Sequence, residues 1–214
     1  MIALFHWFVK ITGWIPQKLV FRTKVYYEDK TVQSRRIKGK AILVSNHTSI
    51  FDYAMVMFLF PFRTIRCLAA EVLYGKGFFM RFMLRGLGMF RVDRDTNDFS
   101  FIDKSRRILD RGGVIEIYPE SRLPLPEEER PLPFKPSAVY LALETDTPII
   151  PIYHTGKLFC KERNRVIIGK PLYLREMVDE NLTHTQNVQV LTQQLRGKII
   201  ELEQLLTEKT EKDR

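Results

Sequence analysis

Short apolar runs alternate along the chain with longer stretches of mixed polarity. The apolar runs have the length of β-strands and lie at 41–45, 65–70, 89–92, 114–118, 149–153 and 166–168. The stretches between several of them carry helical spacing or helix-ending residues, which predicts helices at 49–60, 76–87, 99–111 and 136–145. Strands that alternate with helices predict an α/β fold, a single domain with a mixed, mostly parallel sheet flanked by helices.

Both ends of the chain are predicted to be helical. Over residues 1–22 large apolar side chains are interleaved with cations, and this helical segment is expected to end near Pro16. Near the other end, apolar side chains recur every three or four residues and predict an amphipathic packing helix over about 185–208. The chain is therefore divided into an N-terminal amphipathic segment, 1–22, and a domain, 23–214.

One stretch breaks the alternation of strands and helices. Six of the eleven prolines lie between 119 and 136, together with three consecutive glutamates at 127–129. Because proline fixes φ and removes a backbone donor, the stretch predicts a stiff surface loop. It follows a predicted strand directly, at the edge of the sheet where α/β proteins usually place function.

Composition and charge limit the classes of molecule that the protein is expected to bind. Hydrophobic residues make up 45% and charged residues 28% of the 214, which excludes a disordered chain. The formal net charge is +9, and residues 1–40 hold nine Lys and Arg against Glu28 and Asp29. A basic chain attracts nucleic acid or anionic lipid. The tryptophans beside these cations favour an anionic membrane surface, whereas a nucleic-acid reading rests on net charge alone, so no nucleic-acid partner is expected.

The sequence also predicts how the protein contacts a membrane and in which compartment it works. No apolar run reaches the roughly 18 residues of a transmembrane helix, and the N-terminus makes a poor signal peptide because its apolar part precedes the charges. Cys67 and Cys160 lack the spacing of a disulfide framework or a zinc site. We expect a peripheral or monotopic protein on the cytoplasmic side of a membrane, without a metal.

Candidate chemistry centres on His47 and Asp52, between a strand and a helix. Histidine exchanges a proton near neutrality, and a carboxylate on one ring nitrogen leaves the other free as a general base. Residues five apart within one helix point about 140° away from each other. The two side chains are therefore predicted to meet only if His47 lies in the turn and Asp52 in the first helical turn.

The segment by itself leaves other interpretations open. A single histidine is often a structural residue with satisfied hydrogen bonds. Ser49 and Asp52 have the spacing of a capping box, which would make Asp52 a helix cap.

Further residue blocks follow this pair in a fixed order. They are Asn46, His47 and Asp52; Gly88 and Arg94 around a short strand; Tyr118-Pro119-Glu120-Ser121-Arg122; Phe134-Lys135; and Pro148-Ile149-Ile150-Pro151-Ile152. In this order, from about 40 to 170, they resemble the glycerophospholipid acyltransferase family with its NHxxxxD motif, which includes bacterial lysophosphatidic acid acyltransferases.

The resemblance implies a reaction and a set of roles. His47 would deprotonate the acceptor hydroxyl and Asp52 would orient His47, while Arg94 and Arg122 would hold the acceptor phosphate. The other substrate-binding candidates are Gly88, Glu120, Ser121 and Lys135, with Arg91 a weaker one. The implied reaction transfers a fatty acyl group from acyl-CoA or acyl carrier protein to 1-acylglycerol-3-phosphate, giving phosphatidic acid, with no bound cofactor and no acyl-enzyme.

The third block departs from the family pattern. Pro119-Glu120-Ser121-Arg122 stands where the family has Pro-Glu-Gly-Thr-Arg, so it is one residue shorter and lacks the glycine that allows a tight turn. The alternatives are an acyltransferase for another lysolipid, such as a lyso-ornithine lipid or a lysophospholipid with a larger headgroup, and a non-catalytic lipid-binding protein. The intact His47 and Asp52 argue against the latter.

Overall fold

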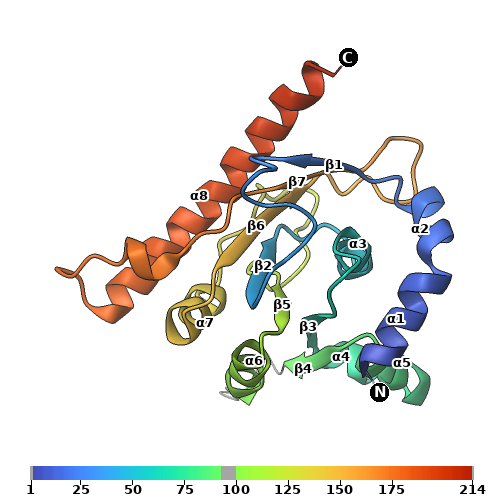
Figure 1. Ribbon diagram of the computed structural model, residues 1–214, viewed down its shortest axis with the longest axis horizontal. Helices are drawn as coiled ribbons and strands as arrows, with labels where there is room; N and C mark the ends of the chain where they lie inside the picture. Colours follow the sequence, from blue (N-terminus) through green and yellow to red (C-terminus); the bar gives the residue numbers. More distant parts are fainter. Residues whose placement is uncertain (1, 93–99, 214) are drawn as a thin grey trace.

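A seven-stranded sheet forms the centre of the molecule, in the order β1-β7-β6-β2-β5-β3-β4 (Figure 1). The computed structural model describes residues 2–92 and 100–213. Every neighbouring pair of strands is parallel except β6 and β7. The strands are β1 Lys24–Tyr27, β2 Ala41–Ser45, β3 Ile65–Ala70, β4 Met89–Val92, β5 Val114–Ile117, β6 Ile149–His154 and β7 Arg165–Ile168. The predicted α/β fold is confirmed.

Helices cover both faces of this sheet (Figure 1). The helices are α1 Ile2–Thr12, α2 Trp14–Val20, α3 Asp52–Leu59, α4 Glu71–Tyr74, α5 Phe78–Gly86, α6 Ser100–Asp110, α7 Ser137–Thr145 and α8 His184–Glu211, with a 3₁₀ turn at Leu174–Met177. Apolar side chains of α3 form one core with Leu43 of β2. Side chains of α6, α7 and α8 form the other with Ile42 and Val44, the alternate positions of that strand.

The central strands are apolar on both sides because both faces are covered. All five residues of β2 and all four of β5 are buried. The residues after these strands, at the carboxyl end of a parallel pair, therefore emerge together at one edge of the sheet.

The predicted end of the N-terminal helix near Pro16 is wrong. The helical segment breaks at Gly13 and continues as α2 to Val20. Pro16 lies in the first turn of α2, where a backbone N–H has no partner within the helix, so proline is tolerated there. At Gly13 a β-carbon would come within 2.6 Å of Phe58 Cζ, so the break falls where the chain passes close to α3.

β1 and α4 were not predicted from the sequence. β1 pairs only with β7 at the edge of the sheet, and its exposed or half-buried residues KVYY alternate too little in polarity to stand out. α4 is a single short turn before α5.

Neither cysteine forms a disulfide: Cys67 is buried in β3 and Cys160 is exposed. Among residues 2–92 and 100–213, no helix combines the length and apolar character needed to cross a bilayer.

Candidate active site

His47 and Asp52 meet at the carboxyl end of β2. His47 lies in the loop after the strand, Asp52 is the first residue of α3, and His47 Nδ1 is 2.9 Å from Asp52 Oδ2. The Asp52 side chain is fully buried and that of His47 is 18% exposed. The predicted condition for their contact is met. An ionised Asp52 keeps the imidazole proton on Nδ1 and leaves Nε2 as the basic nitrogen.

The carboxylate of Asp52 also orders the loop that carries His47. Its Oδ2 accepts the backbone N–H groups of Thr48 at 2.6 Å and Ser49 at 2.8 Å. Burial alone would raise the pKa of Asp52, but the hydrogen bond from His47, the nearby His154 and these two amides together lower it. The capping box predicted for Ser49 and Asp52 is only half formed. Asp52 accepts the N–H of Ser49, as in a capping box. The helix N-cap, however, is Phe51, which has no side-chain cap, and Ser49 Oγ accepts the N–H of Phe51.

Tyr118, directly after β5, stacks on His47. The two ring centroids lie 4.4 Å apart with 25° between the planes. The Tyr118 hydroxyl donates to Glu116 Oε1 at 2.6 Å. Glu116 is fully buried in β5, and burial raises the pKa of its carboxyl well above the usual range. The stacked ring shields one face of the imidazole from water and restricts its rotation.

A reciprocal pair of hydrogen bonds joins the ends of β2 and β6 next to His47 and Asp52. The Asn46 side-chain amide donates to His154 O at 2.9 Å and accepts His154 N–H at 3.0 Å. The His154 ring is buried, with Nε2 3.0 Å from Asn46 O and 3.9 Å from Asp52 Oδ2. Burial lowers the pKa of His154, so the ring is neutral and Nε2–H donates to Asn46 O.

Glu120 braces two loops. The residue is 5% exposed, and its carboxylate accepts the N–H of His47 with one oxygen and the N–H of Leu132 with the other, each at 2.8 Å. Both oxygens are thereby engaged with backbone. The structure gives Glu120, predicted as a substrate contact, a direct role in holding the His47 backbone.

Ser121 stands where the family pattern has its glycine. Its φ of +64° lies in the left-handed region, where glycine is usually preferred. The chain turns here, and the Ser121 N–H donates to Tyr118 O at 3.0 Å. Arg122, the next residue, is exposed and forms a two-pronged pair with Glu128, with nitrogen–oxygen distances of 2.7 and 2.5 Å. Its guanidinium is thus paired with a carboxylate of the proline-rich loop.

The remaining predicted substrate residues are more scattered. Gly88 is buried just before β4 with φ +87°, and a β-carbon there would approach Ile65 O to 3.1 Å. Lys135 is exposed, and its backbone N–H donates to Pro119 O. Arg91 is exposed on β4. Arg94 lies outside the described residues.

Three features of the site were not predicted from the sequence: the buried Glu116, the buried His154, and the stacking of Tyr118 on His47. Glu116 interrupts an otherwise apolar strand, which was an available signal. His154 is separated from His47 by most of the domain, so only the pairing of β2 with β6 brings them together. No group of three His, Cys, Asp or Glu side chains suited to a metal occurs among the described residues, and the expectation that no metal takes part stays a prediction.

The chain is similar in sequence to known acyltransferases. The sequence profile of the acyltransferase family matches residues 22–155. A human 1-acyl-sn-glycerol-3-phosphate acyltransferase beta is 24% identical over 69% of this chain and 53% of its own length. 1-Acyl-sn-glycerol-3-phosphate acyltransferases of Cocos nucifera and Limnanthes douglasii are 27% and 31% identical, each over 58% of this chain and 40% and 43% of their own lengths. The chain spans about half or less of these curated relatives.

A solved structure supports the same fold. The crystal structure of the 1-acyl-sn-glycerophosphate acyltransferase PlsC from Thermotoga maritima superposes with a TM-score of 0.64 at 17% identity, over 94% of this chain and 79% of that one. The family match covers more than half of the chain and includes His47, Asp52 and the third block. The chain therefore belongs to the acyltransferase family, as its ordered blocks of residues predicted.

Proposed function

We propose that this protein transfers a fatty acyl group from a thioester to the free hydroxyl of a lysophospholipid, with 1-acylglycerol-3-phosphate as the acceptor and phosphatidic acid as the product. The observation that carries the proposal is the contact of His47 Nδ1 with the buried Asp52 carboxylate. The curated relatives named as 1-acyl-sn-glycerol-3-phosphate acyltransferases support the choice of acceptor.

In the proposed reaction, Nε2 of His47 takes the proton of the acceptor hydroxyl while its oxygen attacks the thioester carbonyl carbon. Asp52 stabilises the imidazolium that forms. The tetrahedral intermediate then expels the thiolate, which takes the proton back from His47, giving an ester and a free thiol. No residue of the chain is acylated, so neither Cys67 nor Cys160 takes part. The thioester is acyl-CoA or an acyl carrier protein.

The third block favours a second candidate acceptor. Because Arg122 already pairs with Glu128, a phosphate monoester would have to displace that carboxylate. An acceptor that brings its own cation beside the phosphate, as larger lysophospholipid headgroups do, would satisfy Glu128 and Arg122 together. Such a lysophospholipid, or a lyso-ornithine lipid, is the alternative to lysophosphatidate.

The deciding experiment measures thiol release from acyl-CoA and from acyl carrier protein with a panel of lysolipids. His47→Ala and Asp52→Asn are each expected to lower kcat by about 10²–10⁴-fold, because the general base is lost or misoriented. His184→Ala, at the exposed start of α8, serves as the matched control. Activity of the folded His47→Ala variant equal to wild type would refute the mechanism, and the lysolipid preferred by the wild type identifies the acceptor.

We also propose that the protein works on the cytoplasmic side of a membrane as a peripheral or monotopic protein. Support comes from large apolar side chains that α1, α2 and α5 leave exposed. These side chains, called here the apolar rim, are Leu4, Trp7, Phe8, Ile11, Trp14, Ile15, Leu19, Phe78, Phe79 and Phe82. The helices are continuous in space, since Phe5 of α1 packs edge-on against Phe82 at 5.7 Å. A membrane-bound acceptor would then lie beside the molecule.

A further inference from the structure

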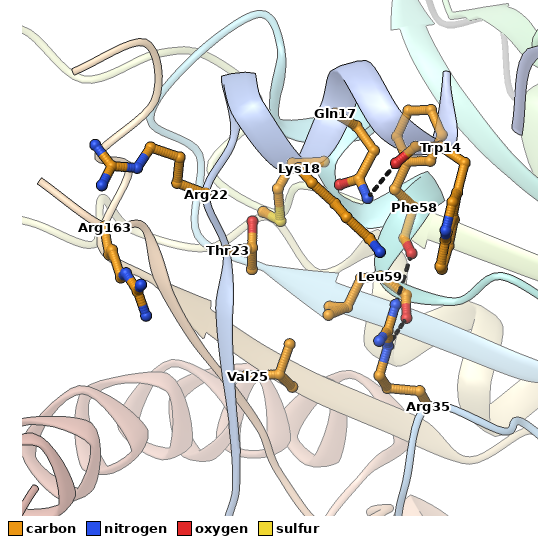
Figure 2. Close-up of a pocket in the computed structure, with 11 residues that line it drawn as sticks. Trp14, Gln17, Lys18, Arg22, Thr23, Val25, Arg35, Phe58, Leu59 and Arg163 are labelled. Carbon is orange, nitrogen blue, oxygen red and sulfur yellow. Dashed lines mark hydrogen bonds between the residues drawn. The ribbon is translucent and has the colours of Figure 1, made fainter. Parts of the chain in front are cut away.

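A basic pocket lies between α2, β1 and α3, apart from the His47–Asp52 pair (Figure 2). Its volume is about 430 Å³. Its α3 wall begins at Met55, one turn beyond Asp52, and continues at Phe58 and Leu59. The pocket therefore lies along the later part of the helix whose first residue serves the proposed active site.

Four cations and, among the described residues, no carboxylate line this pocket. The cations are Lys18, Arg22, Arg35 and Arg163. Figure 2 shows Lys18 of α2 and Arg35 pointing toward one another at one end, with Arg22 and Arg163 at the other. Like charges gathered around a common space repel one another, and a bound anion relieves that repulsion. The lining therefore selects an anionic ligand.

Among the residues that the structure describes, two of the four cations form hydrogen bonds within the protein, and the other two do not. Arg35 donates to the carbonyls of Phe58 and Leu59 at the end of α3, and Arg22 donates to Lys161 O. Lys18 lies over the Trp14 ring at 5.0 Å. In the described part of the chain, neither Lys18 nor Arg163 has a hydrogen-bond or carboxylate partner. These two cations are available to a ligand.

The rest of the pocket indicates what kind of anion fits. Val25, Met55, Phe58 and Leu59 provide apolar contacts beside the cations. On the adjoining face of α2, Ile15 and Leu19 are 71% and 74% exposed. A ligand with an anionic head and apolar chains matches this arrangement, because the cations meet its phosphate while its chains continue along the exposed apolar face.

We propose that this basic pocket binds the phosphate headgroup of an anionic glycerophospholipid of the membrane, at a site separate from the one where acyl transfer takes place. The apolar rim would give the protein non-specific adhesion to the bilayer, and the pocket would add recognition of one anionic lipid molecule. Occupancy would also tie α2 to β1 and α3.

The test is binding of dihexanoyl phosphatidylglycerol below its micelle concentration, measured by calorimetry on the full chain. Wild type is expected to bind it saturably and to bind dihexanoyl phosphatidylcholine more weakly. Lys18→Gln combined with Arg163→Gln should weaken binding at least about tenfold, since each phosphate contact contributes roughly fivefold. Both side chains are exposed, so folding should survive.

The control pair is Arg36→Gln with Lys38→Gln, which lowers the net charge of +9 by the same two units outside the pocket. It should change binding less than twofold, and His47→Ala should bind as wild type does, which separates this site from the catalytic one. Equal weakening by both pairs would reduce the effect to net charge and overturn the proposal. Saturable binding of inorganic phosphate or CoA without binding of the lipid would overturn it as well.

Discussion

At the scale of single residues, the ionisable groups at the carboxyl ends of β2, β5 and β6 include two buried acids, Asp52 and Glu116, whose pKa values shift in opposite directions. The amides of the loop and His47 keep Asp52 ionised despite its burial. Glu116, equally buried, accepts the Tyr118 hydroxyl with Oε1, while its Oε2 has no hydrogen-bond partner among the described residues. Donors around a carboxylate, and not burial alone, thus decide which acid is charged.

The raised pKa of Glu116 predicts a pH dependence of stability. Below the ordinary pKa of 4.5, Glu116 is protonated in both the folded and the unfolded chain. Above it the unfolded chain ionises while the folded chain holds its proton, so the free energy of unfolding falls as pH rises, by up to about 1.4 kcal/mol per unit. Glu116→Gln removes this loss, so its stability relative to wild type should increase as the pH rises above 4.5.

The quantity to measure is how the difference in free energy of unfolding between Glu116→Gln and wild type changes with pH, and not its size at one pH. The amide introduced by Glu116→Gln would occupy the place of the unpartnered Oε2, at a pH-independent cost of about 1–3 kcal/mol, so the variant starts out less stable. Urea unfolding of both proteins at several pH values gives the difference directly, because the other titrating groups cancel. A difference that stays constant with pH would show that Glu116 ionises in the folded protein.

At the scale of elements, the sequence predicted well what a run of residues determines by itself. β2, β3 and β4 were predicted with their observed ends, because each is a short, mainly apolar run between turn-forming residues, although β3 and β4 each contain one arginine. The contact of His47 with Asp52 was also predictable, since it depends on one strand–helix boundary. β1 was missed because an edge strand does not need two apolar faces. The contact of Glu120 with the backbone of Leu132 was not predicted, because the two residues lie across a loop.

Glu120 ties the loop after β2 to the proline-rich loop after β5, which predicts a combined effect on stability and catalysis. Glu120→Gln replaces one acceptor oxygen by an NH₂ group that faces a backbone N–H. The lost acceptor should lower the free energy of unfolding by roughly 1–3 kcal/mol, and the displaced His47 should lower kcat more than it changes KM. Thermal unfolding and steady-state kinetics measure the two effects.

Glu129→Gln is the matched control, because Glu129 is an exposed residue of the same loop. It should leave both quantities unchanged. If Glu120→Gln instead raised KM with kcat intact, Glu120 would be a substrate contact, as the family resemblance suggested.

At the scale of the whole molecule, charge and apolar surface lie together. The first 40 residues hold nine of the 34 Lys and Arg, and the same part of the chain supplies most of the apolar rim. α8 lies across the opposite side of the sheet from α1 and α2 (Figure 1). The molecule is therefore polarised, and this apolar, basic side is the one that we propose faces an anionic bilayer.

This polarity predicts that a few exposed side chains control membrane binding. Removal of residues 1–22 is a poor test, because Lys10 and Phe21 are buried against the domain and their loss would disturb the fold. Ile15→Ser combined with Leu19→Ser changes only exposed positions of α2. About 1.5–3 kcal/mol of burial is lost per side chain that inserts fully, so flotation with vesicles containing anionic lipid should fall at least about tenfold.

Two exposed apolar residues that are not part of the rim provide the comparison. Val32 and Leu125 are 56% and 54% exposed, and Val32→Ser with Leu125→Ser should float as wild type does. Vesicles of phosphatidylcholine alone should bind wild type weakly, because the cations then have no anionic surface to meet. If both serine pairs floated as well as wild type, membrane contact would have to be made elsewhere, and the exposed phenylalanines of α5 would be the next positions to change.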